Sequence, residues 1–572
     1  MLDDVIAMAA GRKEPELLLT NARVLNVFSG DIETTHVAVG HGVIVGMGRE
    51  YAHAQQVHDL REKYLLPGFI DGHVHLESSL LSPARYAEAV VPHGTTTVVA
   101  DPHEIANVTG IAGLRYMLHA TERLPLEAYF MVPSCVPATA LETAGAELGP
   151  SLVAAALHQN RILGLAEVMN YPGVIGAERQ VLEKVLAARR AGKLIDGHAP
   201  GLGGQALMAY LSAGIGSDHE CTTFAEAREK LSRGMWIMLR EGSASRNLEA
   251  LCPVVTPLTA RRCLLVSDDR DAWDLTHDGH MDALLRKTVA LGVDPLLAVQ
   301  MATLNPAAYF GLRQHGAIAP GAVADLVVVT DLHDFAVEQV FKRGTLVAEQ
   351  GHLVTPLVEE VPVEFLHTVH LPPLSRETLT MPATSSKVRV IGIVPGQILT
   401  QQQIREAPVR DGRIVADPTR DLLKLVVVER HRRTGNIGLG LVRGFGLRAG
   451  AMATSVAHDS HNVIGVGVDD DDLLCALQEV GRLQGGMAVC QGGRVLSSLA
   501  LPIAGLMTSA PLSQVISDVE ALHRSTRALG TSLARPFMAL SFLALPVIPE
   551  LRLTDRGLVD VNRSCFVSLN VE

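Results

Sequence analysis

The sequence predicts an α/β protein: a TIM-like (β/α)8 barrel inserted in a small β-sandwich and followed by a further domain. The first observation is size, since 572 residues of 48% apolar composition exceed one ordinary core and can supply several. The second is an alternation of eight apolar runs with helix-like stretches over about 250 residues, the size of such a barrel. The third is a strand-rich pattern on both sides of this region.

Each of the eight apolar runs closes on polar residues, either at its end or directly after it, and precedes a helix-like stretch. The runs are Gly68–His75, Thr95–Asp101, Ala128–Pro133, Ile162–Glu167, Leu194–His198, Ile215–His219, Trp236–Leu239 and Cys263–Asp268. Helix candidates between them include Glu178–Ala191 and Met281–Leu291. A doubly wound open sheet is the competing fold for this alternation, and the number of units favours the closed barrel.

Two strand-rich segments, Glu16–Gly48 and Gly316–Gly351, consist of short runs broken by Asn, Gly and Asp. Because they flank the barrel, we expect them to build one β-sandwich from both sides. The predicted divisions are 1–60 and 316–370 for the sandwich and 61–315 for the barrel. Residues 371–572 form an α/β or α+β domain by composition, with strand-like segments Ser386–Thr400, Leu422–His431 and Asn462–Val468 and a helix over Asp470–Gly481.

Composition and charge argue against nucleic-acid binding and against a membrane-spanning segment. A net charge of −12 and a pI near 6.0 give no electrostatic reason to bind nucleic acid. The longest apolar stretch, Pro536–Pro549, is broken by prolines and falls short of the roughly 20 residues of a membrane span. Seven scattered cysteines without a CxxC pair indicate reduced thiols. The N-terminus carries acids where a secretory signal carries bases. We expect a cytoplasmic homo-oligomer acting on a small molecule.

Metal-binding residue types recur where the predicted strands end. In "PGFIDGHVHLESS", His73 and His75 share one face of a strand and point together toward the barrel mouth. Four other strands end in Glu167, His198, His219 and Asp268. Buried polar groups cost free energy unless they are paired, and divalent metal would pair them. Their number suits two ions about 3.5–4 Å apart with one bridging carboxylate, for which Glu167 is the candidate. A single ion with spare polar residues is the alternative.

These motifs carry a family resemblance. "PGFIDGHVHLESS", "GHAPG", "SDHE" and "SDD", in this order, resemble the amidohydrolase superfamily. "DPHEIANVTG", "AEVMNYPGVIG" and "SVAHDSHNVIGVGVDDDD" resemble its adenine deaminase branch, so the likeness covers most of the chain. It implies two divalent ions per chain, Mn or Fe before Zn, held by His73, His75, Glu167, His198, His219 and Asp268.

Related branches fit less well. Many binuclear relatives bridge their metals with a carboxylated lysine on strand four, but "RILGLAEVMN" contains Glu167 and no lysine. Adenosine deaminases carry a glutamate after the strand-five histidine, whereas here Glu220 follows His219. The HxE and PCxxC arrangement of cytidine-type deaminases is absent from the sequence. A deaminase of a free purine base fits best.

The expected reaction is hydrolysis of adenine to hypoxanthine and ammonia by a metal-activated water. Asp268 would move a proton from that water to the departing ammonia. Glu220 would protonate or hydrogen-bond a ring nitrogen, or would instead orient His219. The alternative substrates are an N6-substituted adenine or a cyclic amide. A non-catalytic binding protein would be expected to lack a ligand, and none is missing.

Five further residues are candidates for substrate binding. His103 and Glu104 follow strand two and could reach the barrel mouth, although a helix cap is an equal alternative. His458, Asp459 and His461 in "AHDSHN" lie just before an apolar strand. We expect them to face the barrel mouth as part of a lid; the alternatives are strand capping or a subunit interface.

Overall fold

The computed structural model describes residues 2–394 and 397–571. Within them, eight parallel strands form a barrel: β6 (Phe69–Val74), β7 (Thr95–Ala100), β8 (Glu127–Val132), β9 (Ile162–Val168), β10 (Leu194–Gly197), β11 (Ser217–Asp218), β12 (Trp236–Arg240) and β13 (Cys263–Val266). Strands β6 to β10 pair in one sheet and β11 to β13 in another. The Gly216 amide donates to the Ile195 carbonyl at 3.0 Å, and Val74 bridges Asp268. These links join the sheets at both edges, so the barrel is closed and the open-sheet alternative is excluded.

Helices connect the barrel strands as the sequence predicts. Both helix candidates form, as α7 (Arg179–Arg190) and α12 (Met281–Ala290). The remaining helices of at least seven residues in this region are α2 (Pro83–Val90), α3 (His103–Thr109), α4 (Ile111–Ala120), α5 (Pro150–Ala156), α8 (Gly204–Ser212), α9 (Phe224–Ser232), α13 (Pro295–Met301) and α14 (Leu304–Phe310). The barrel interior is packed by apolar side chains such as Ile70, Val99 and Met238. The polar residues at the strand ends therefore lie directly above a packed apolar interior.

The two flanks of the barrel build one nine-stranded sheet. The N-terminal flank supplies β1 (Leu17–Leu25), β2 (Ile32–Gly40), β3 (Val43–Met47), β4 (Gln56–Asp59) and β5 (Tyr64–Pro67), and the other flank supplies β14 (Leu326–Val329), β15 (Val337–Lys342), β16 (Thr345–Glu349) and β17 (His352–Leu353). The flanks meet where β5 and β14 pair antiparallel, with Leu326 opposite Pro67. Because β5 belongs to this sheet, the sheet extends past residue 60 to the start of the barrel.

The last domain is an α+β unit around a second nine-stranded sheet. Its strands are β19 (Lys387–Ile393), β20 (Thr400–Glu406), β23 (Leu423–Val428), β24 (Ile437–Arg443), β25 (Ala451–Thr454), β26 (Val463–Gly467), β27 (Gly486–Gln491), β28 (Arg494–Ala500) and β32 (Asn570–Val571). All pairs are antiparallel except β19 with β24. The predicted helix is α15 (Asp470–Arg482), and α16 (Leu512–Ala528) follows. Residues 395–396 of the predicted segment Ser386–Thr400 lie outside the described residues.

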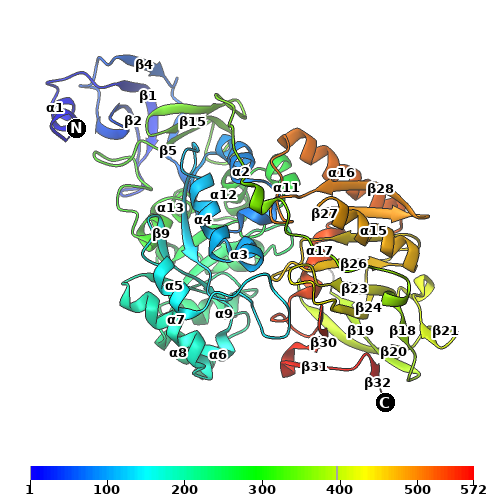
Figure 1. Cartoon of the computed structure of the whole chain (residues 1–572). Coiled ribbons are helices and arrows are strands. Elements are labelled where there is room, and N and C mark those ends of the chain that lie inside the picture. The colour runs from blue at the N-terminus through cyan, green and yellow to red at the C-terminus, as the bar shows by residue number, and fades with distance from the viewer. Residues whose placement is uncertain (1, 395–396, 572) are drawn as a thin grey trace.

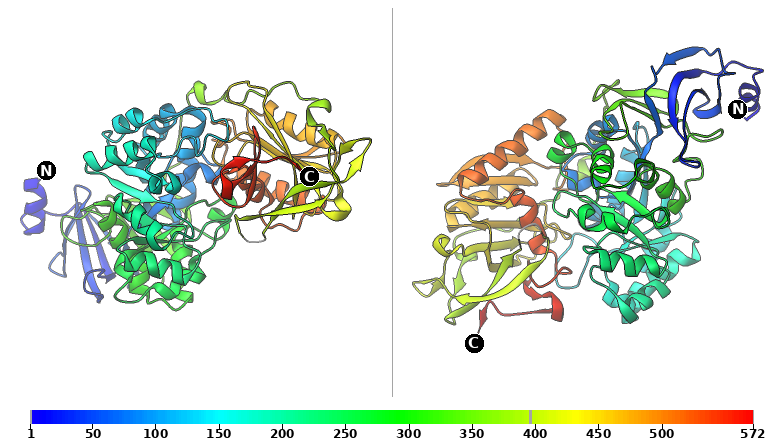
Figure 2. Two further views of the ribbon diagram at one scale, coloured as in Figure 1. Left: turned by 90° about the horizontal axis from the view of Figure 1, so that it is seen from below. Right: turned by 180° about the vertical axis from the view of Figure 1, so that it is seen from behind.

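The last domain packs beside the barrel in every view (Figures 1 and 2). Leu81, after the first barrel strand, bridges Thr508. The Thr554 hydroxyl donates to the Leu141 carbonyl at 2.7 Å, and Arg432 Nε donates to the Ala144 carbonyl at 3.0 Å. These bonds attach the last domain to loops that follow barrel strands. The domain therefore lies against the end of the barrel where the polar residues gather.

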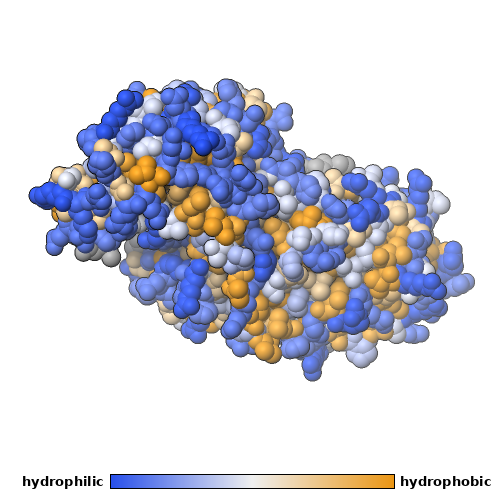
Figure 3. All heavy atoms as spheres, turned by 90° about the horizontal axis from the view of Figure 1, so that it is seen from above, coloured by the Kyte–Doolittle hydropathy of each residue, from blue (hydrophilic) through white to orange (hydrophobic). Residues whose placement is uncertain are grey.

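Hydrophilic residues predominate on the face shown in Figure 3, and hydrophobic residues gather in groups between them. Among the described residues, no helix combines the length and the apolar character needed to cross a membrane.

Candidate active site

The six predicted metal ligands converge at the carboxyl end of the barrel strands, and each is at most 7% exposed. Glu167 stands among them at the end of β9. Its Oε2 lies 2.7 Å from His198 Nδ1 and 3.1 Å from His219 Nε2. Its Oε1 lies 3.4 Å from His75 Nε2. The Asp268 Oδ1 lies 3.1 Å from His75 Nε2 and 3.5 Å from His73 Nε2. The two oxygens of one carboxylate thus face two different groups of imidazoles.

These spacings fit divalent cations. Ligand atoms about 2.0–2.2 Å from an ion lie about 3.3–3.6 Å apart in tetrahedral geometry and somewhat closer in octahedral geometry. The distances at this rim span 2.7–3.5 Å. His73 Nε2 is fully buried and has no hydrogen-bond partner, which is costly for a polar atom unless something binds it. The side chains therefore suit a metal centre on chemistry and on spacing.

Hydrogen bonding orients the His75 ring. His75 Nδ1 lies 3.0 Å from the main-chain carbonyl oxygen of Asp101. Because that oxygen can only accept, Nδ1 carries a proton, and Nε2, which faces Glu167 and Asp268, is the nitrogen of the neutral ring that can bind a cation. Such a bond from the second ring nitrogen is the usual device that fixes a ligating histidine.

The carboxylates and imidazoles of the rim shift one another's pKa values toward the charged forms. Burial opposes ionisation of Glu167, yet the neighbouring His219 and His198 hold the pKa of Glu167 well below its usual range. In turn, Glu167 outweighs the effect of burial and raises the pKa of His219 to about 9. Because metals bind neutral imidazole, metal binding here releases protons and weakens as pH falls.

Arg240, the last residue of β12, holds two carboxylates in place. Its guanidinium forms an ion pair with both oxygens of Glu220, at 3.0 Å for Oε2, and donates to Asp268 Oδ2 at 2.8 Å. Burial alone would raise the pKa of Glu220, but the positive charge of Arg240 has the larger effect and lowers this pKa below its usual value. Glu220 Oε1 is 3.6 Å from His219 Nε2, too far for a hydrogen bond.

Asp268 adopts a left-handed backbone conformation with φ 56°. This conformation is uncommon outside glycine and is often found at functional sites.

A second cluster crosses from the barrel to the last domain. Glu104 accepts a 2.6 Å hydrogen bond from His458 Nδ1 through Oε1 and contacts His461 Nε2 through Oε2. His461 Nδ1 accepts from the Ala457 amide at 3.1 Å, so the proton of this ring is on Nε2 and is donated to Glu104. Burial disfavours charged His458, yet Glu104 raises the pKa of His458 to about 9. All three side chains are at most 3% exposed.

Both clusters meet at one cavity. Its lining includes predicted ligands and Glu220, and also His103, Glu104, His458 and Asp459 of the predicted substrate group. His461 does not line it and instead supports Glu104 from behind. The cavity measures about 380 Å³ with the space open to solvent included, and its other wall is apolar: Ile398, Phe542, Leu545 and Ile548 of the last domain. The Phe542 ring stacks on His458 at 4.5 Å between centroids.

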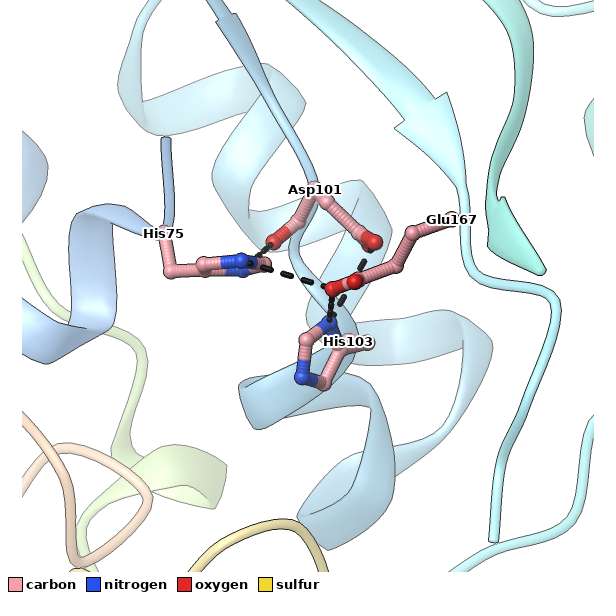
Figure 4. A group of neighbouring side chains, drawn as sticks. All are labelled: His75, Asp101, His103 and Glu167. Carbon is pink, nitrogen blue, oxygen red and sulfur yellow. Dashed lines mark hydrogen bonds and ion pairs between the residues drawn. The ribbon is translucent and has the colours of Figure 1, made fainter. Parts of the chain in front are cut away.

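Figure 4 shows a further group on the β7 side of the rim. Asp101 and His103, from the end of β7 and the start of α3, point toward Glu167, as does His75. His103 Nδ1 lies 3.3 Å from Asp101 Oδ2 and 3.4 Å from Glu167 Oε1, and His103 Nε2 is 3.8 Å from Asp459 Oδ1. His103 thus stands between the rim and the last domain.

Sequence reasoning gave no role to Asp101, Arg240 or the apolar wall. Asp101 and Arg240 occupy strand ends, so the rule that found the ligands could have found them. Phe542, Leu545 and Ile548 lie in an apolar stretch with no feature that separates a cavity wall from an ordinary core.

The fold and the rim define a metal-dependent hydrolase of the amidohydrolase type. Residues 64–347 match the model of the amidohydrolase family, and residues 397–565 match that of the adenine deaminase C-terminal domain. The first match spans the barrel and the second lies in the last domain. The amidohydrolase family implies that divalent metal binds at the rim.

The chain belongs to the adenine deaminase family. It is 50% identical over 560 residues to the adenine deaminase of Dehalococcoides mccartyi (strain CBDB1), covering 98% of each chain. It is 49% identical to adenine deaminase 2 of Carboxydothermus hydrogenoformans over the full length of both. Among solved structures, the β-aspartyl dipeptidase of Fervidobacterium islandicum AW-1 aligns with 60% of the chain and 99% of its own length, with 18% identity and a TM-score of 0.47.

The charge on His458 should appear in the pH dependence of stability. The pKa of His458 is about 9 in the folded state, above the ordinary value of about 6.5, so its charge contributes stability that is fully present below pH ~6.5 and is lost as pH rises through 9. We expect the loss of unfolding free energy in His458→Gln, measured by urea denaturation, to be larger at pH 6 than at pH 10 by about 3 kcal/mol. His119→Gln, at a site with 83% of the side chain exposed, is the control. A loss from His458→Gln that is the same at every pH contradicts this pairing.

Proposed function

We propose that this chain hydrolyses adenine to hypoxanthine and ammonia in the cavity between the barrel and the last domain. The observation that carries the proposal is that five of the six metal-type ligands line one cavity, together with Glu104 and His458 of the cross-domain cluster and an apolar wall. Full-length relatives at about 50% identity that are named adenine deaminases support the choice of substrate. A flat purine suits a site with polar groups along one side and apolar side chains on another.

The proposed metal centre holds two divalent ions that share Glu167. His73, His75 and Asp268 would hold the first ion with Glu167 Oε1, and His198 and His219 would hold the second with Oε2. When bound, such ions lower the pKa of water from 15.7 toward about 7 and so supply the nucleophile. Mixed imidazole and carboxylate ligands suit Mn, Fe or Zn; we propose Mn or Fe, with Zn as the alternative.

Asp268 is the proposed proton carrier. The Arg240 contact and the rim histidines outweigh burial and hold the pKa of Asp268 well below its usual range. The carboxylate is therefore ionised and able to accept the proton of the attacking water. It would then deliver this proton to the amino group that leaves C6 as ammonia. Arg240, bonded to Oδ2, keeps the other oxygen directed at the reacting centre.

The proposed contacts to the base use one hydrogen-bond acceptor, Glu220, and one donor, His458. Glu220 is ionised by Arg240, so it would accept a hydrogen bond from a ring N–H rather than donate a proton. His458 Nε2 is buried without a hydrogen-bond partner and belongs to a cavity-lining residue. The charged ring would donate from Nε2 to a ring nitrogen. His103 and Asp459 extend this polar side, and the Phe542 wall excludes water, which strengthens these interactions.

We also propose that the protein is a cytoplasmic homo-oligomer. Its seven cysteines are unpaired in the structure, which supports a reducing compartment.

A substrate panel tests the proposed reaction. Metal-loaded protein is incubated with adenine, adenosine, N6-methyladenine and a hydantoin, and the release of ammonia or amine or the opening of the ring is followed. We expect the highest kcat/KM for adenine, by at least about tenfold, a difference of about 1.4 kcal/mol in transition-state binding. A preference for N6-methyladenine or the hydantoin would contradict the adenine assignment.

Glu167→Gln tests the bridging carboxylate. The amide keeps the shape but loses one anionic oxygen, so at least one ion should be bound more weakly and turnover should fall by more than about 100-fold. Metal content is measured after dialysis and activity in the same samples. Glu142→Gln changes another buried glutamate, which lines a different cavity, and should retain metal. Wild-type metal content with wild-type turnover in Glu167→Gln would refute the bridging role.

A further inference from the structure

We infer a third divalent-cation position beside the two-ion centre, formed by Asp101, His103 and Glu167 on the β7 side of the rim. The inference rests on the proposed function, because Glu167 is shared with that centre. Asp101 and His103 are outside the ligand set proposed above, and Figure 4 shows both directed at Glu167.

The first support is unsatisfied polarity. Asp101 is 1% exposed and His103 is 4% exposed. Both carboxylate oxygens of Asp101 and the Nδ1 of His103 are buried without a hydrogen bond. Buried groups of this kind normally have partners, and an uncompensated buried carboxylate is especially unfavourable. The main-chain carbonyl of Asp101 accepts from His75, so the residue is held firmly, while its carboxylate makes no hydrogen bond and has the 3.3 Å contact with His103.

The second support is spacing. His103 Nδ1 lies 3.3 Å from Asp101 Oδ2 and 3.4 Å from Glu167 Oε1. One ligand atom from each of these residues and one from His75 all lie within 4.8 Å of one another. The two measured distances match the separation of about 3.3–3.6 Å between ligands on a tetrahedral ion with bonds of about 2.0–2.2 Å. One imidazole and two carboxylates suit Mn or Zn.

The third support is charge. Six buried carboxyl groups line or adjoin the cavity: Asp101, Glu104, Glu167, Glu220, Asp268 and Asp459. Asp101 and Asp459 both lie beside His103, where the rim meets the last domain. A cation at Asp101 would place positive charge between these two carboxyl groups. The competing arrangement is a protonated His103 that pairs with Asp101 and leaves no cation there.

A Mn titration separates the two arrangements. Chelator-treated protein is saturated with MnCl2, and bound Mn per chain is measured by equilibrium dialysis with elemental analysis. We expect about three ions in the wild type and about two in Asp101→Asn and in His103→Ala. Glu142→Gln, which likewise replaces a buried carboxylate without hydrogen bonds by an amide, should keep three. Circular dichroism confirms that each variant is folded, and anomalous scattering from Mn-loaded wild-type crystals provides a test that needs no variant.

Three ions in the wild type, with a third anomalous peak between Asp101 and His103, support the position. Two ions in the wild type and in both variants, without that peak, overturn it in favour of protonated His103 and leave the two-ion centre intact. A fall from two ions to one in Asp101→Asn would make Asp101 a ligand of that centre and overturn the third position too. Fewer than two ions in the wild type would overturn both proposals.

Discussion

The interaction on which the site depends is the contact of one buried carboxylate, Glu167, with imidazoles from several barrel strands. Its two oxygens face different histidines. The charge of Glu167 raises the pKa of His219, and the neighbouring histidines lower the pKa of Glu167. Neither partner would be stable alone in this position, because buried charge must be paired. The barrel makes the pairing possible by bringing the ends of strands β6, β9, β10 and β13 to one rim above a packed interior.

The last domain extends the same principle to the barrel mouth. Glu104 lies on the barrel and its two partners, His458 and His461, lie about 350 residues later in the chain. This link places the stacked His458 and Phe542 rings at the cavity. A barrel rim alone is open to water, whereas the apolar wall of the last domain lowers the local dielectric and strengthens each charged contact. The pairing of the two domains is therefore part of the chemistry of the site.

Much of the fold was predictable because local pattern and fold agree. Most barrel strands are apolar runs with a polar residue at the end or within two residues after it, and closure follows from the number of units. Sequence could not reveal that Glu104 contacts His461, since no local pattern encodes a contact across so long a separation. It also could not distinguish His458, which faces the cavity, from His461, which faces Glu104. That difference arises from tertiary hydrogen bonds, among them the one from the Ala457 amide.

A crystal structure of Mn-loaded protein with hypoxanthine, the product, would show directly whether barrel and last domain bind the base together. We expect the base in the cavity between the rim and the Phe542 wall, with its oxygen at the rim beside Asp268. Glu220 should lie within hydrogen-bond distance of a ring N–H, and His458 Nε2 within hydrogen-bond distance of a ring nitrogen. Hypoxanthine bound to the barrel without any contact to the last domain, or bound away from the Glu167 rim, would show that the two domains do not form one site.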